Sequence, residues 1–140
     1  MTVRVERGFD VEAPPEDVWE YVSDPTTRAR AISVVDRFEQ RDDSFVWHLA
    51  LPIPFVRTTV EVRTNDVARE PPSYVKFRGR SSAFTVVGEH EISTVDGQTH
   101  VSNSFVVDGR VPGVERFFER NFGSEIANLE RGLRRHLENR

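Results

Sequence analysis

The chain has 140 residues, 37% of them hydrophobic and 30% charged, and its formal net charge at pH 7 is −4. This length and composition predict one soluble domain spanning residues 1–140. The acidic balance disfavours a nucleic-acid partner, which needs a basic surface, and the absence of cysteine excludes disulfides and thiolate chemistry. No apolar stretch approaches the roughly 18 residues of a membrane-spanning helix, and residues 1–10 lack the apolar centre of a signal peptide, so we expect a cytoplasmic protein.

The first half of the chain predicts one strand, two short helices and then further strands. Residues Val3–Glu12 alternate between apolar and polar side chains, as a half-buried strand does. The prolines that follow suit the start of a helix over Glu16–Val22, and Ser23 or Asp24 caps a second helix over Thr26–Ala31. The strands predicted next are Val34–Gln40, Ser44–Leu51 and Val56–Thr64.

Three more strands and one long helix are predicted in the second half. Arg69–Pro72 is a predicted turn, and Asp96-Gly97 predicts a type I′ hairpin turn, which needs positive φ at both central residues. From Pro112 to Arg140 apolar residues recur at steps of four and three, the pattern of one face of an α-helix. The strands are Tyr74–Ser81, Phe84–Thr94 and Thr99–Asp108, and the apolar helix face consists of Val114, Phe118, Phe122, Ile126, Leu129, Leu133 and Leu137. The order predicts an α+β fold in which a curved, seven-stranded antiparallel sheet packs against the long C-terminal helix.

Residues 9–25, with the sequence FDVEAPPEDVWEYVSDP, carry a likeness to a known family. They resemble the opening of the START-like superfamily, also called SRPBCC or Bet v 1-like, which includes polyketide cyclase/dehydrase-like proteins, coenzyme Q-binding proteins and plant allergens. The order of elements matches over essentially the whole chain. The resemblance implies a helix-grip fold, in which the sheet wraps the last helix and leaves a cavity between them. That scaffold hosts carriers, receptors, cyclases and chaperone cofactors, so the resemblance implies a fold and no single activity.

Three polar side chains, those of Arg7, His90 and Asn103, fall on strand faces that are otherwise apolar. Counting outward from the predicted hairpin turn pairs His90 with Asn103, at a separation that permits a hydrogen bond. The resemblance implies that the first strand pairs with the last, which brings Arg7 beside Asn103. Glu125, at the edge of the helix face, is placed to face the same space. We interpret the four either as a polar anchor for a ligand's oxygen or carboxylate, or as groups satisfied by one another, by buried water or by solvent.

The function predicted from these features is binding or transport of a small or medium hydrophobic molecule (a lipid, a quinone or a polyketide-like compound) between the sheet and the last helix. The alternative is an enzyme of the cyclase or dehydratase type, with His90 as general acid or base and Arg7 or Asn103 polarising a carbonyl. No other catalytic residue is predicted. The expected apolar wall is Phe9, Phe45, Trp47, Phe77, Phe84, Phe105 and Phe118, which would pack a solid core equally well, and the expected anchors are Arg7, His90, Asn103 and Glu125.

The proline-flanked apolar loop Leu51–Val56 is predicted to be a lid or mouth of the cavity. Contact with a membrane or a partner protein is the alternative, which the lack of a neighbouring basic cluster disfavours. No metal-ligand spacing, phosphate-binding loop or nucleophile elbow is present, so no metal or cofactor is expected. The remaining side chains that suggest chemistry are given structural interpretations: Asp42-Asp43 as a hairpin turn, and His48, His100 and His136 as solvated residues.

Overall fold

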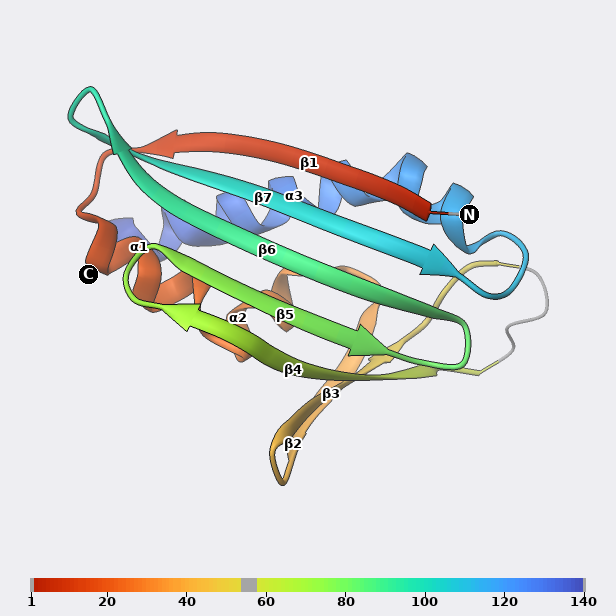
Figure 1. Cartoon of the computed structure of the whole chain (residues 1–140). Helices are drawn as coiled ribbons and strands as arrows, with labels where there is room; N and C mark the ends of the chain where they lie inside the picture. Colours follow the sequence, from red (N-terminus) through yellow and green to blue (C-terminus); the bar gives the residue numbers. More distant parts are fainter. Residues whose placement is uncertain (1, 54–57, 140) are drawn as a thin grey trace.

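In the computed structural model, which describes residues 2–53 and 58–139, a curved sheet wraps one face of a long helix (Figure 1). The predicted α+β helix-grip fold is confirmed. The elements are β1 (Thr2–Val11), α1 (Pro15–Val22), α2 (Pro25–Ala31), β2 (Val35–Arg41), β3 (Ser44–Leu49), β4 (Val60–Glu70), β5 (Tyr74–Arg80), β6 (Phe84–Val95), β7 (Gln98–Gly109) and α3 (Val114–Glu138).

The seven strands are antiparallel and follow the order β1-β7-β6-β5-β4-β3-β2. The first strand therefore pairs with the last and forms one edge of the sheet. Asp96 and Gly97 have φ angles of 51° and 81°, as a type I′ turn requires. The turn fixes the register of the β6–β7 hairpin, and His90 lies opposite Asn103 as predicted. On the other side of β7, Asn103 lies opposite Arg7 of β1.

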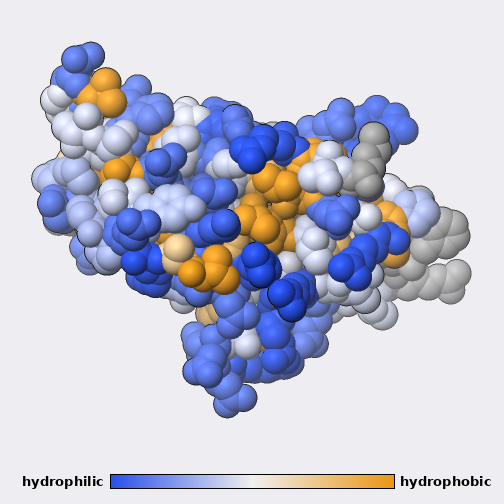
Figure 2. All heavy atoms as spheres, in the orientation of Figure 1, coloured by the Kyte–Doolittle hydropathy of each residue, from blue (hydrophilic) through white to orange (hydrophobic). Residues whose placement is uncertain are grey.

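The apolar face of α3 lies against the concave side of the sheet. Its predicted residues from Val114 to Leu133 are buried, and Leu137 is partly buried. Phe117 and Glu125 are buried as well, which widens the covered part of the helix. The convex side of the sheet, which faces the viewer in Figure 2, is largely hydrophilic with smaller hydrophobic areas between charged side chains. A sheet with one apolar face is therefore covered by one long helix, the arrangement that buries both.

The structure extends one predicted strand. β4 continues to Glu70, six residues beyond the predicted end at Thr64, and the turn follows it. The register between β4 and β5 shifts between Asp66 and Ala68, and such a bulge breaks the alternation of side chains on which the prediction depended. The described part of this strand begins at Val60, and the predicted start at Val56 lies outside the described residues.

The prediction that His48 is solvated is wrong. Every residue of β3 is buried, and the His48 side chain is only 6% exposed although it lies on the outer face of the sheet. β3 runs between β2 and β4, which place the long side chains of Arg37 and Glu61 opposite His48. The carboxylate of Glu39, also on β2, lies 3.2 Å from the His48 Nε2 atom. Long charged neighbours thus cover a position that alternation alone assigns to solvent.

Candidate functional site

A small cavity lies between α2, the sheet and the middle of α3. Its volume is about 20 Å³, room for about one water molecule. Three of the predicted wall residues (Trp47, Phe77 and Phe105) and two of the predicted anchors (His90 and Glu125) line it. The remaining lining residues come from the two helices and the residue after α2: Arg28, Ala31, Ile32, Phe122, Ile126 and Leu129.

The other predicted wall residues are buried but do not line this cavity. Phe45, Phe84 and Phe118 pack in the main core, and Phe9 belongs to a second cluster beneath α1. In the main core the aromatic rings contact one another closely; the ring centroids of Phe105 and Phe122, for example, lie 4.7 Å apart. The interpretation of these aromatics as core therefore fits all seven, three of which also line the cavity, because interdigitated side chains fill most of the space between sheet and helix.

Arg7 was predicted to be a polar anchor in the cavity, but it does not line the cavity. Its side chain is 46% exposed and reaches over the edge of the sheet towards α3. There its guanidinium lies 3.9 Å from the carboxylate of Glu130 and 3.5 Å from the carbonyl oxygen of Gly123. β1 is an edge strand, so a long side chain on its inner register can leave the core and avoid the cost of an unpaired buried charge.

Glu125 is buried at the cavity wall, and its carboxylate accepts hydrogen bonds from Ser33, two residues after the end of α2. Ser33 donates to it from the backbone N–H at 2.6 Å and from the hydroxyl at 2.5 Å. Asn128, one helical turn further along α3, donates at 3.4 Å. This carboxylate therefore joins the end of α2 to α3 and closes one side of the cavity.

His90 and Asn103 form the hydrogen bond that their predicted pairing permits. Their Nδ1 and Oδ1 atoms are 2.7 Å apart, and the Asn103 amide donates from Nδ2 to the carbonyl oxygen of Arg7 at 3.0 Å. Because this donation fixes Oδ1 as the atom that faces the histidine, Nδ1 of His90 carries the proton. The other ring nitrogen, Nε2, is then an acceptor. It is buried and has no hydrogen-bond partner among the described residues.

Burial in this apolar wall lowers the pKa of His90 to about 4, and the positive charge of Arg28 adds to the shift. The hydrogen bond that Nδ1 of His90 donates to Asn103 and the charge of Asp66 oppose the shift without reversing it. Near neutral pH the ring is therefore uncharged, with one nitrogen donating and one nitrogen free to accept.

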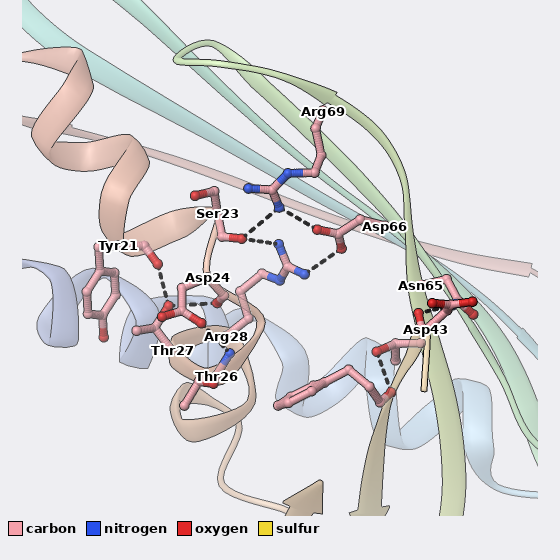
Figure 3. A network of polar contacts seen from close by, with 12 residues as sticks. Tyr21, Ser23, Asp24, Thr26, Thr27, Arg28, Asp43, Asn65, Asp66 and Arg69 are labelled. Atoms are coloured by element: carbon pink, nitrogen blue, oxygen red, sulfur yellow. Dashed lines mark hydrogen bonds and ion pairs between the residues drawn. The ribbon is translucent and has the colours of Figure 1, made fainter. Parts of the chain in front are cut away.

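Arg28 of α2 is the residue of this site that sequence reasoning missed. Its side chain is 5% exposed, and Nη2 forms an ion pair of 2.7 Å with Asp66 of β4. Asp66 also binds Arg69 at 2.6 Å, and both arginines donate to the carbonyl oxygen of Ser23, as Figure 3 shows. The guanidinium lies 5.0 Å from the ring centroid of Phe77, within range of a cation–π contact. Burial lowers the pKa of Arg28, and the charge of Asp66 opposes that shift.

In addition to Nε2 of His90, two buried nitrogen atoms of cavity-lining residues lack a hydrogen-bond partner among the described residues: Nε of Arg28 and Nε1 of Trp47. Both carry hydrogen and only donate. The cavity wall thus contains two side chains with an unpaired donor and one with an unpaired acceptor, set among apolar groups. Buried polar groups are normally paired, so these three atoms are available to a hydrogen-bonding partner that enters the cavity.

Part of the predicted lid lies outside the described residues. On the described side Leu51 is buried and Ile53 packs partly against the main core, whereas residues 54–56 of the loop lie beyond it. Contact of this loop with a membrane or a protein stays a prediction. None of the helices within the described part of the chain is long and apolar enough to cross a membrane. The same residues contain no group of three or more His, Cys, Asp or Glu side chains that could hold a metal ion.

The family model described as polyketide cyclase/dehydrase and lipid transport matches residues 2–138. The chain belongs to this family. The resemblance to the START-like superfamily is thereby confirmed. No curated protein sequence matches the chain. The family's description covers both enzymes and carriers, so membership leaves the choice between them to the site.

Several solved structures have the same fold. A conserved protein from Geobacillus kaustophilus is 15% identical, with a TM-score of 0.74 and coverage of 98% of this chain and 96% of that chain. A START superfamily protein from Mycobacterium smegmatis is 13% identical, with a TM-score of 0.71 and coverage of 97% of both chains. An aromatase/cyclase from a Streptomyces species is 18% identical, with a TM-score of 0.67 and coverage of 98% and 96%. At these identities the similarity establishes the fold alone.

Proposed function

We propose that this protein binds a small or medium hydrophobic molecule, such as a lipid, a quinone or a polyketide-like compound, in the cavity between the sheet and α3. The observation that carries the proposal is the buried acceptor nitrogen of His90 in an otherwise apolar wall. Asn103 holds that ring in one tautomer, so the acceptor is ready before any ligand arrives. Apolar pockets with a few fixed polar groups are the usual form of small-molecule sites. A cytoplasmic location is part of the same proposal.

The unpaired atoms of the wall specify the polar groups of the ligand. Nε2 of His90 accepts a hydrogen bond from a hydroxyl or amine, and Nε of Arg28 and Nε1 of Trp47 donate to a carbonyl, quinone or carboxylate oxygen. We therefore expect an apolar molecule that carries at least one hydroxyl group and one oxygen acceptor. A ligand that makes these bonds removes the cost of leaving the three atoms unpaired.

Binding requires the cavity to open. Pockets for small molecules measure roughly 300–1,000 Å³, and this cavity measures about 20 Å³. Arg28 and Ala31 of α2, with Ile32 directly after it, form one wall, and α2 has only seven residues. A helix this short has little stability of its own and depends on its tertiary contacts. We therefore propose that α2 moves outward when a ligand enters, a change that leaves the pairing of the strands intact.

The enzymatic alternative is less well supported. A cyclase or dehydratase would need His90 to take up and release a proton near neutral pH, and a general base works best when its pKa lies close to that pH. Burial holds the pKa of His90 at about 4. We therefore assign His90 to orienting the ligand and not to proton transfer.

Native mass spectrometry of the protein purified gently from its own host tests the proposal. We expect a reproducible bound mass that is reduced in His90→Phe, which keeps a planar ring and removes the acceptor, and in Trp47→Phe, which removes one donor. His100→Phe is the matched control, because His100 lies outside the cavity beside Asp10. A folded protein that carries no ligand and ignores a panel of quinones, lipids and aromatic polyketides would refute the proposal.

A further inference from the structure

A second hollow, open to solvent and about 600 Å³ in volume, lies between α2 and the C-terminal half of α3. We call it the basic groove. Three arginines line it, Arg30 from α2 and Arg131 and Arg135 from α3, and no carboxylate among the described residues does. The chain as a whole has a net charge of −4, so this concentration of positive charge runs against its overall balance.

The charge of the groove is not neutralised within the described part of the protein. Arg30 lies over the ring of Phe38 at 5.7 Å, Arg131 donates to the side-chain oxygen of Asn128, and neither they nor Arg135 form an ion pair with a described residue. By contrast Arg134, which does not line the groove, pairs with Glu130 at 2.9 Å. Uncompensated guanidinium groups that converge from two helices are suited to binding carboxylate or phosphate oxygens.

Further hydrogen-bonding groups complete the wall between these arginines. Tyr21 lies against Gly132, where a Cβ atom would overlap its hydroxyl oxygen. Its ring packs on His136 with centroids 5.3 Å apart, and the Nε2 atom of His136 is buried without a hydrogen-bond partner among the described residues. Burial raises the pKa of Tyr21 and the charges of Arg135 and Arg30 oppose that rise, so the phenol stays protonated at neutral pH and can donate.

The basic groove and the core cavity share a wall. Ala31 lines both, and Ser33 on the groove side donates two hydrogen bonds to Glu125 on the cavity side. The end of α2 is therefore the partition between a cationic surface groove and an apolar interior. The outward movement of α2 that enlarges the cavity would also join the two spaces.

We propose that the basic groove binds the anionic head group of an amphiphile whose apolar part enters the core cavity past Ala31. The inference rests on the proposed function and adds the ligand's class: a molecule with a carboxylate or phosphate at one end and an apolar body. The groove's unpaired charge accounts for the head group, and the shared wall accounts for the attached apolar part. A neutral ligand wholly enclosed in the core would leave the unpaired charge of the basic groove without a binding partner.

Isothermal titration of the full chain with matched probes tests this inference. The probes are decanoate, decyl phosphate and decan-1-ol, with acetate and inorganic phosphate as anions that lack a chain. We expect the two charged ten-carbon probes to bind at least about tenfold more tightly than the alcohol, because charge-assisted hydrogen bonds are the stronger kind. Arg131→Gln and Arg135→Gln should each weaken the charged probes on the order of tenfold and leave the alcohol unchanged. Arg120→Gln, an exposed arginine on the same helix outside the groove, is the control.

Each other outcome overturns the inference in a recognisable way. If the alcohol binds as tightly as decanoate and the groove variants leave both affinities unchanged, the groove does not bind the head group, while the proposed function stands. If acetate or phosphate binds as tightly as decanoate in an Arg131-dependent manner, the groove takes free anions and has no connection with the cavity. If no ten-carbon probe binds, the inference fails, and native mass spectrometry of the host-purified protein then decides the proposed function separately.

Discussion

His90 owes its chemistry to its neighbours. Asn103 fixes which nitrogen carries the proton, and the backbone of Arg7 fixes which way Asn103 points. Burial and the charge of Arg28 keep the ring neutral. These hydrogen bonds leave Nε2 of His90 as the one unpaired acceptor of the ring. The two-residue turn sets the register of the β6–β7 hairpin, and that register sets the position of this atom.

The neutral state of His90 makes stability depend on pH. Its pKa is lowered from 6.5 to about 4 on folding, so the unfolded chain binds the proton more readily and acid favours unfolding. The stabilisation is fully present above about pH 6.5 and is lost progressively as the pH falls towards 4, by on the order of 3 kcal/mol in the free energy of unfolding. We expect urea unfolding at pH 7.5 and 4.5 to show a smaller loss for His90→Phe than for the unaltered protein. An NMR titration that places the His90 pKa near 6.5 would contradict the argument.

At the scale of elements, the ion pair between Arg28 and Asp66 ties α2 to β4. The two residues are 38 positions apart, and Arg69 from the same strand shares the carboxylate. Removing one partner of a buried pair leaves an uncompensated charge, whereas replacing the buried arginine with an apolar side chain removes the charge itself. Substituting Asp66 and substituting Arg28 should therefore change the free energy of unfolding by different amounts.

Asp66→Ala should lower the free energy of unfolding by about 3 kcal/mol, because the Arg28 charge stays buried among Phe77 and the core. Arg28→Met, of similar length, should cost less, since Asp66 keeps Arg69 as its partner. Urea unfolding midpoints of the two variants measure the difference, with Arg120→Gln as a surface control. An equal or larger loss for Arg28→Met would show that the arginine's own contacts, and not its charge balance, stabilise α2.

For the whole molecule, the two proposals together describe a ligand held at both ends: a hydroxyl group inside at His90 and an anion outside in the basic groove. The two contacts lie on different elements and share no partner among the described residues, so their contributions to binding should add.

The compound 10-hydroxydecanoate, which carries both groups, should therefore bind more tightly than decanoate, by on the order of fivefold for one additional neutral hydrogen bond. The gain should vanish in His90→Phe and persist in Arg131→Gln, which weakens both compounds equally. Titration of both ligands with the three proteins measures this. A gain that persists in His90→Phe would show that the hydroxyl group does not reach the histidine.

The sequence by itself determined the features that depend on local geometry. Side-chain periodicity gave the strands and the long helix, and the Asp96-Gly97 turn gave the pairing of His90 with Asn103, because a two-residue turn leaves one register. Only the tertiary structure decided the rest. Arg28 becomes a cavity residue through its ion pair with Asp66, which lies at a bulge beyond the predicted end of the strand. Arg30 meets Arg131 and Arg135 because α2 packs against α3. Such features depend on how distant segments pack and on which side chains fill the space between them, and no local pattern records that.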